Sequence, residues 1–344
     1  MHRLLLTLLI VISICPGAAA AETPSDEITI AIVGDILLTD AVVGGRGADY
    51  PWAMVAPLLR GADLAIGNLE TAVSLRGAPV AGKQFTFRSR PGALAGAANA
   101  GIDVVTLANN HSRDYGPQAL LDTIAHVRAA GMQPVGAGRD ADEAIRPVML
   151  DARGLKVAVL AFTRVIPDAA WVAGYQTPGL ASGWDPQPVL EAIRKARSAA
   201  DVVVVLTHWG EEMKDHPRPT DAELAGPMLD AGATVVAGHH PHVLQGFRRR
   251  GAGLVAFSLG NFIFTTSTNP LARETGVLTV TLGRRGVTRA RFTPLVLVNG
   301  QPRPAARADA RRILARLARL SRPWETRVSP TGAITGAPAP FPPQ

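Results

Sequence analysis

Residues 202–208 read Val-Val-Val-Val-Leu-Thr-His, and residues 234–242 read Thr-Val-Val-Ala-Gly-His-His-Pro-His. The uninterrupted apolar run in the first stretch predicts a strand buried on both faces, as in a parallel sheet covered by helices. Both runs lead directly into histidine. Because the carboxyl ends of parallel strands meet at one edge of a sheet, the sequence predicts an α/β fold with polar side chains gathered at that edge.

The rest of the chain alternates between strand-like and helix-like segments. Strands are predicted at 28–33, 62–66, 103–107, 155–162, 201–206, 233–237, 254–258, 277–282 and 287–293, the last two as a hairpin. Helices are predicted near 51–60, 91–100, 117–130, 187–199 and 220–231. This alternation is typical of a chain whose strands are connected by helices packed on the faces of the sheet.

Residues 1–21 have the features of a secretory signal peptide. Arg3 gives a basic start, residues 4–14 are mostly apolar, and Ala18-Ala19-Ala20 offers small residues for cleavage. An uncleaved N-terminal anchor is the alternative. We therefore expect an exported protein of the periplasm or cell envelope. Cys15 is the only cysteine, so the cleaved product would have no thiolate, and a bound metal would take imidazole, carboxylate or amide ligands.

The positive charge of the chain is concentrated near its C-terminus. The formal net charge is +7, but residues 303–327 hold eight arginines and only two acids, which leaves the preceding body nearly neutral. A neutral body argues against nucleic acid as a partner. We predict a signal peptide (1–21), one domain (22–300), an Arg-rich amphipathic helical tail (301–328) and a disordered Pro/Ala-rich tail (329–344). The helix either docks on the body or binds an anionic surface.

Acidic and amide side chains follow the first two predicted strands. The carboxylate of Asp35 either binds a hard cation or caps the next turn. Asn68 and Glu70 are two residues apart, so an extended backbone places both on one side. A capped loop is again the alternative.

The segment Asn109-Asn110-His111, with Asp114 three residues later, is the sharpest cluster. Asn110 can offer an amide oxygen to a metal. His111 can protonate a leaving group if a neighbouring carboxylate sets its tautomer. We predict His111 and Asp114 to be catalytic, and a loop histidine bonded to backbone is the alternative.

Three histidines within four residues, His239, His240 and His242, are the strongest metal signal, because packing alone rarely explains such a group. The spacing of His240 and His242 lets both reach one ion or straddle two. Spacing alone leaves open whether His239 or His240 is the ligand. His208 ends a buried strand, where it is either a ligand or a core histidine. Asn261 supports a ligand or forms a turn.

These motifs occur in the order found in the bacterial capsule-synthesis protein CapA family, which is associated with poly-γ-glutamate. The chain resembles that family from about residue 28 to residue 264. The motifs that carry the resemblance are Gly34-Asp35, Gly67-Asn68-Leu69-Glu70-Thr71, Phe85-Thr86-Phe87-Arg88, Leu107-Ala108-Asn109-Asn110-His111, Asp114-Tyr115-Gly116, His208-Trp209-Gly210, His240-Pro241-His242 and Ser258-Leu259-Gly260-Asn261-Phe262. That family is similar to the calcineurin-like metallophosphoesterases. The resemblance therefore implies a metallophosphatase-like four-layer α/β/β/α sandwich, usually with a two-metal centre.

The resemblance also implies which residues form the centre. The implied ligands of one or two divalent ions (Mn, Fe or Zn) are Asp35, Glu70, Asn110, His208, His240 and His242. The predicted substrate-binding residues are Lys83, Arg88, Asn68, Glu211 and Asn261. Arg88 is the best candidate for an anionic group because its fork matches carboxylate or phosphate, although a surface ion pair would explain it equally.

The chain departs from the phosphatase pattern at two positions. That pattern begins Asp-x-His, but here Asp35-Ile36-Leu37 lacks the histidine. Its second motif is Gly-Asp, where this chain has Asn68-Leu69-Glu70. One metal position is therefore poorer in ligands.

The resulting hypothesis is an exported cell-envelope protein of poly-γ-glutamate or capsule biosynthesis type, acting as a metal-dependent hydrolase or transferase on phosphoester or γ-glutamyl bonds. Its expected partners are an anionic polymer or phosphoester substrate and a membrane polymer-synthesis complex. The alternative is a non-catalytic, polymer-binding subunit of a polyglutamate synthesis or export complex. Asn110-His111 favours the first hypothesis, and the two departures from the phosphatase pattern favour the second.

Overall fold

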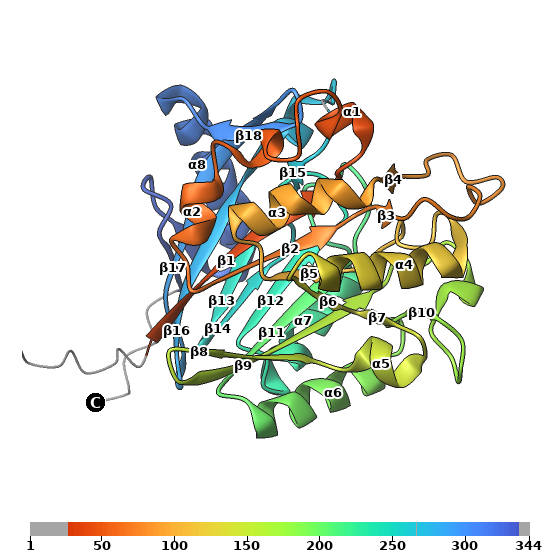
Figure 1. The fold of residues 1–344 in the computed structure, drawn as a ribbon. Coiled ribbons are helices and arrows are strands. Elements are labelled where there is room, and N and C mark those ends of the chain that lie inside the picture. Colours follow the sequence, from red (N-terminus) through yellow and green to blue (C-terminus); the bar gives the residue numbers. More distant parts are fainter. Residues whose placement is uncertain (1–26, 266, 337–344) are drawn as a thin grey trace, which may run out of the picture.

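The computed structural model of this protein describes residues 27–265 and 267–336. Two large β-sheets lie face to face, and helices cover the outer face of each (Figure 1). The predicted four-layer α/β/β/α sandwich is thereby confirmed. Among the described residues, no helix combines the length and the apolar composition needed to cross a bilayer.

The first sheet has the strand order β18-β17-β16-β1-β2-β5-β6, with β15 paired to the end of β1. Its strands are β1 (Glu27–Ile36), β2 (Leu64–Leu69), β5 (Val104–Thr106), β6 (Gln133–Val135), β15 (Asn261–Ile263), β16 (Glu274–Gly283), β17 (Gly286–Val298) and β18 (Gln301–Pro304). The neighbours from β1 to β6 are parallel, whereas β16, β17 and β18 continue the sheet as an antiparallel meander. The predicted hairpin is β16–β17.

The second sheet has the order β13-β14-β12-β11-β9-β8. Its strands are β8 (Val148–Ala152), β9 (Leu155–Thr163), β11 (Val202–His208), β12 (Val235–His239), β13 (Phe247–Arg250) and β14 (Gly253–Ala256). The four central strands are parallel, and β8 and β13 are antiparallel edges. Three short pairs lie outside the two sheets: β3 (Ala72–Val73) with β4 (Arg88–Ser89), β7 (Ala137–Gly138) with β10 (Gly179–Leu180), and β19 (Thr326–Val328) with β20 (Ile334–Gly336).

Helices follow most of the parallel strands. They are α1 (Asp40–Val43), α2 (Ala56–Arg60), α3 (Leu94–Ala100), α4 (Gly116–Ala129), α5 (Ala141–Ile145), α6 (Pro186–Ala199), α7 (Pro219–Asp230) and α8 (Arg307–Ser321). Short 3₁₀ turns occur at η1 (Tyr50–Trp52), η2 (Pro91–Ala93), η3 (Ala169–Trp171), η4 (Pro270–Arg273) and η5 (Arg322–Trp324). Helices α2, α3 and α4 cover the first sheet, and α5, α6 and α7 cover the second (Figure 1).

The apolar side chains of β11 show why the chain adopts this layering. Val202, Val204 and Leu206 belong to the core between the two sheets, whereas Val203 and Val205 pack under the outer helices. Successive residues of a strand point to opposite faces, so a continuous apolar run is buried on both sides. Phe247 of the second sheet meets Phe292 of the first across the inner core, with ring centroids 5.8 Å apart.

The C-terminal region differs from its prediction as a separate tail. Strand β18 extends the first sheet, and α8 packs Ile313, Leu314 and Leu317 into the core between the sheets. Helix α8 therefore docks on the body, which is the first of the two interpretations given for this segment. The predicted irregular segment from residue 329 contains β20, and residues 337–344 and the predicted signal peptide lie outside the described residues.

Candidate metal centre

The polar cluster lies where carboxyl ends of parallel strands from both sheets meet. In the first sheet, the register pairs Asp35 of β1 with Asn68 of β2 and with Asn261 of β15. In the second sheet, His208 of β11 is paired with His239 of β12. Side chains from the two sheets then contact one another, so the cluster bridges the sandwich at this edge.

Two buried carboxylates are held together by an amide. Asn68 Nδ2 donates to Asp35 Oδ1 at 2.8 Å and lies 3.4 Å from Glu70 Oε2. Asn68 Oδ1 in turn accepts from Asn109 Nδ2 at 2.9 Å. The amide of Asn68 is fully buried and occupied by these partners. Asn68 therefore orients the two acids, and its predicted contact with substrate stays a prediction.

Two imidazoles reach these acids from the second sheet. His208 Nε2 lies 2.8 Å from Asn110 Oδ1 and 3.7 Å from Glu70 Oε1. His242 Nδ1 lies 3.2 Å from Asp35 Oδ2, and its Nε2 lies 3.9 Å from Glu70 Oε1. The structure thus brings together the acid, amide and imidazole groups that the sequence assigned to one centre.

The structure also decides between the two adjacent histidines. His239 Nε2 lies 3.0 Å from the carbonyl oxygen of Val33, which fastens this ring to the backbone. The His240 ring lies 4.8 Å from that of His208 and 5.8 Å from that of His242, centroid to centroid. His240 and His242 both have left-handed backbones, with φ of 96° and 59°. Such conformations are unfavourable for residues other than glycine and are concentrated at functional sites.

The unsatisfied atoms of the cluster fit a cation. Glu70, His240 and His242 each offer a ligand atom, and these atoms lie within 4.8 Å of one another. Glu70 Oε1 and His240 Nδ1 are buried and have no hydrogen-bond partner among the described residues. An unpaired buried acceptor costs about 1–3 kcal/mol, and more if it is charged. Imidazole and carboxylate are the donors that Mn, Fe and Zn accept, so these residues could hold a divalent metal ion.

The electrostatics of the cluster separate its histidines. Burial, reinforced by the neighbouring histidines, holds the pKa of His208 well below its usual value, and burial together with His242 lowers that of His240 to about 3. Burial also opposes the charging of His242, but the charge of Glu70 and the contact with Asp35 raise its pKa to about 10. Burial and the charge of Asp35 raise the pKa of Glu70. In the metal-free protein, the raised pKa values of Glu70 and His242 therefore favour bound protons, and these protons compete with a metal cation for the same atoms.

A histidine–aspartate pair lies beside the cluster. His111 Nδ1 is 2.7 Å from Asp114 Oδ2, and the Asp114 carboxylate also accepts from the Phe87 backbone N–H at 2.6 Å. Lys83 forms an ion pair with Asp114 and lies 3.1 Å from His111 Nδ1. Since Lys83 only donates and Asp114 accepts, we assign the Nδ1 proton of His111 to the bond with Asp114. Burial lowers the pKa of His111.

The remaining predicted substrate-binding residues are not brought together. Arg88 donates to two loop carbonyls at 2.7 and 2.8 Å and stacks on Tyr115, so its guanidinium is fixed to its own loop. Glu211 is exposed in the loop after β11. Asn261 Oδ1 accepts from His242 Nδ1 at 2.8 Å and therefore positions an imidazole. Lys83 alone lies beside the predicted catalytic pair.

Comparison with known proteins places the chain in a family. The model of the bacterial capsule synthesis protein PGA_cap matches residues 29–266. This chain belongs to the PGA_cap family. The capsule biosynthesis protein CapA of Bacillus anthracis is 34% identical to it, over 87% of this chain and 75% of that protein. The PGA biosynthesis protein CapA of Bacillus subtilis strain 168 is 31% identical, over 83% and 78%. The family predicted from the motifs is confirmed.

Solved structures also resemble this PGA_cap chain. The NAD nucleotidase NadN of Haemophilus influenzae aligns with 85% of this chain and 62% of its own, at a TM-score of 0.47 and 12% identity. At that distance the similarity assigns no activity.

Two residues near the centre of this PGA_cap chain were not among the predicted site residues. The Phe87 ring lies 4.3 Å from that of His111, and the positive charge of Arg218 contributes to the low pKa of His240. Phe87 belongs to a motif of the resemblance, which could have drawn attention to it. Arg218 lies in a loop with no recognisable pattern.

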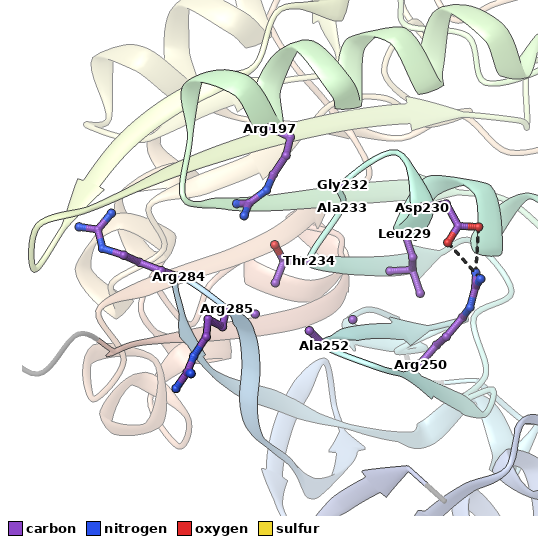
Figure 2. A pocket seen from close by; sticks show the side chains of 12 residues that line it. Arg197, Leu229, Asp230, Gly232, Ala233, Thr234, Arg250, Ala252, Arg284 and Arg285 are labelled. Atoms are coloured by element: carbon purple, nitrogen blue, oxygen red, sulfur yellow. Dashed lines mark hydrogen bonds and ion pairs between the residues drawn. The ribbon is translucent and has the colours of Figure 1, made fainter. Parts of the chain in front are cut away.

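An arginine-lined cavity lies away from the centre, at the amino ends of β12 and β14 (Figure 2). Three of its arginines are engaged: Arg250 pairs with Asp230, Arg284 pairs with Asp201, and Arg197 donates to the carbonyl oxygens of Ala200 and Asp201. The histidine cluster lies at the opposite ends of these parallel strands. The cavity is therefore separate from the candidate metal centre.

Proposed function

We propose that this protein is an exported member of a poly-γ-glutamate capsule biosynthesis system that hydrolyses or transfers phosphoester or γ-glutamyl bonds with the help of a metal ion. The observation that supports this best is the trio of Glu70, His240 and His242, whose ligand atoms lie within 4.8 Å of one another. A histidine–aspartate pair suited to proton transfer lies next to it. A centre that served only to hold the fold together would have no need of that pair.

The metal would be held by the residues of the cluster. Glu70, His240 and His242 would ligate one divalent ion, Mn, Fe or Zn, with His208 and Asn110 as further donors. A bound divalent ion would act as a Lewis acid that polarises an acyl or phosphoryl oxygen. If a second ion bound, Asp35 is the carboxylate of the cluster that would be left to ligate it. Leu37, fully buried, occupies the place of the phosphatase histidine, so we expect one ion or a weak second one.

His111 would move a proton at its Nε2 atom. The bond from Nδ1 to Asp114 fixes the ring and leaves Nε2 for the leaving oxygen or nitrogen of the substrate. Asp114 is fully buried and would stabilise the imidazolium. The ammonium group of Lys83 partly neutralises the Asp114 carboxylate through their ion pair. The same ammonium group would contact an anionic group of the substrate. Phe87 packs on the ring and shields it from water.

The proposed location and partners rest on the sequence and on the relatives. The N-terminal residues have the composition of a secretory signal, and the curated relatives are named as capsule or PGA biosynthesis proteins. We therefore propose a periplasmic or cell-envelope location. The substrate would be an anionic polymer or a phosphoester, and the partner would be a membrane complex that synthesises the polymer.

The experiment that tests the proposal compares metal-loaded wild-type protein with His111→Ala on two substrates, a γ-linked glutamate oligomer and a generic phosphodiester. His111→Ala should keep its metal and lose activity about 10²–10⁴-fold, because general acid–base catalysis contributes that much. The matched control is His126→Ala, because His126 Nδ1 bonds to the Val73 carbonyl at 2.9 Å, far from any metal role. Turnover at the wild-type rate by His111→Ala would refute the acid role.

A second function, a non-catalytic polymer-binding subunit, is favoured by Leu37 at the position of a phosphatase ligand. In that case the wild-type protein would bind the glutamate oligomer and turn over neither substrate, with or without metal. The same assay therefore separates the two functions.

A further inference from the structure

Two arginines share one buried aspartate beside the metal centre. Arg164 directly follows β9, and its Nη1 lies 2.6 Å from Asp221 Oδ1. Arg218 directly precedes α7, and its Nε lies 2.7 Å from Asp221 Oδ2. The side chains of Arg164 and Arg218 are only 10% and 23% exposed, and that of Asp221 is fully buried. This arrangement, the Arg164–Arg218 pair, takes no part in the mechanism above.

A backbone contact places the Arg164–Arg218 pair beside His208 of the centre. The backbone N–H of Arg164 donates to the carbonyl oxygen of His208 at 2.8 Å. The register also pairs Thr163, the residue before Arg164, with His208. The Arg164–Arg218 pair therefore lies at the same edge of the second sheet as His208.

The charge of the pair is unbalanced. Two guanidinium groups, Arg164 and Arg218, share the single negative charge of Asp221. The group therefore carries one excess positive charge, and its side chains are mostly removed from solvent. Such a charge is costly unless an anion compensates it. Arg164 Nη2 and Arg218 Nη1 have no hydrogen-bond partner among the residues that the structure describes. Each guanidinium thus keeps a donor for a ligand.

An exposed tryptophan shapes the same place. The guanidinium carbons of Arg164 and Arg218 lie 5.1 and 5.7 Å from the ring centroid of Trp184. Trp184 is 54% exposed, so its ring can be reached from solvent. Both guanidinium groups are thus within cation–π distance of the same ring.

Acids in the neighbourhood do not neutralise the pair. Asp215 lies 2.6 Å from His216 Nδ1 and 3.7 Å from Arg316 Nη2, and is therefore engaged elsewhere. Glu211 and Glu212 are exposed, and among the described residues neither forms an ion pair with Arg164 or Arg218.

We propose that Arg164 and Arg218 form an anion subsite that binds a free carboxylate of a γ-glutamyl chain, while the adjacent bond of that chain lies at the metal centre. The proposal rests on the function proposed above and names the group that its substrate would present. Each residue of a γ-glutamyl chain carries one free carboxylate, and a planar guanidinium edge matches that group. Phosphate has similar chemistry, so the test includes it.

The test measures binding of a γ-linked glutamate pentamer to the metal-loaded full chain by isothermal titration calorimetry. Arg218→Gln should raise Kd about tenfold to a hundredfold, as expected for loss of a hydrogen bond between charged groups. The matched control is Arg285→Gln, which removes the same charge from an exposed arginine of the cavity in Figure 2. The control should bind like the wild-type protein.

A second measurement keeps the test independent of how well the variant folds. The pentamer should quench the tryptophan fluorescence of the wild-type protein, and Trp184→Phe should abolish this quenching. Equal pentamer affinity in Arg218→Gln and wild type, or quenching that survives in Trp184→Phe, would overturn the subsite. Binding of inorganic phosphate but not of the pentamer would overturn its assignment to a γ-glutamyl carboxylate.

Metal content separates this proposal from the proposed function. Arg218→Gln should bind as much metal as the wild-type protein, because Arg218 ligates nothing in the cluster. Loss of pentamer binding with full metal content supports the subsite. If the wild-type protein binds the pentamer through Arg218 but turns over no substrate, the subsite stands and the hydrolytic function fails.

Discussion

Binding of a divalent metal should release at least one proton from the cluster, mainly from His242. The charge of Glu70 and the contact with Asp35 raise the pKa of His242 to about 10, against the opposing effect of burial. At pH 7 this imidazole is protonated and cannot ligate. Removing its proton there costs about 4 kcal/mol, since each pKa unit is worth about 1.36 kcal/mol. Apparent metal affinity at pH 7 should therefore be about 10³-fold weaker than at pH 10, and should rise about tenfold per pH unit.

The same proton affects stability with a definite sign. The pKa of His242 in the folded, metal-free protein lies above its ordinary value of 6.5, so its contribution to the free energy of unfolding is fully present below pH 6.5. That contribution is lost as the pH rises through about 10. Metal should therefore stabilise the protein more at pH 8 than at pH 6.

The assay is calorimetric titration with Mn²⁺ at pH 6.5, 7.25 and 8.0, each in two buffers of different ionisation enthalpy. The difference in apparent enthalpy between buffers gives the number of protons released. Asp35→Asn is the informative variant, because it removes a charge that raises the pKa of His242 and should flatten the pH dependence. An affinity independent of pH, with no buffer dependence of the enthalpy, would refute this account of the cluster.

Three further predictions test other parts of the molecule. Asn261→Ala removes the acceptor 2.8 Å from His242 Nδ1, and metal affinity should fall about 10–100-fold in a metal titration; unchanged affinity would show that this bond is not needed. Phe247→Ala opens a cavity against Phe292 between the sheets and should lower the unfolding free energy by about 3–5 kcal/mol in urea, and a loss below about 1 kcal/mol would contradict the packing. Activity that needs protonated His111 should decline as the pH rises through a pKa below 6.5, and a flat pH–rate profile over pH 5–7 would contradict it.

The parallel core could be predicted from the sequence because its signal is local. The run Val202–Val205 is apolar on both faces, and the structure buries it on both faces. The edge strand β13 was not predicted, since three of its four residues are arginines and its pairing with β14 is a tertiary contact. The predicted helices at 51–60 and 91–100 each begin as a 3₁₀ turn with proline near the start, and only the first is interrupted before its α-helical part. Proline fixes the backbone locally and removes a donor.

The ligand set could be predicted in part. A ligand at a strand end is marked by its neighbours in sequence, which is how His208 and Glu70 were found. Spacing alone left His239 and His240 equivalent; the family resemblance named His240, and the physical reason is the contact of His239 with the Val33 carbonyl, which lies 206 residues away in sequence. Arg164 and Arg218 meet only through the fold, so no spacing could reveal them.

The central claim is that the buried cluster binds one divalent ion, and metal content tests it most directly. Wild-type protein, His240→Ala, His208→Ala and His216→Ala would be dialysed against Mn²⁺ or Zn²⁺ and analysed by mass spectrometry for bound metal. The matched control is His216→Ala, because that side chain is 64% exposed and pairs with Asp215 away from the cluster. We expect about one ion per chain in wild type and His216→Ala, and a large loss in the two cluster variants with folding retained. Full metal content in both cluster variants, or none in the wild-type protein, would contradict the account.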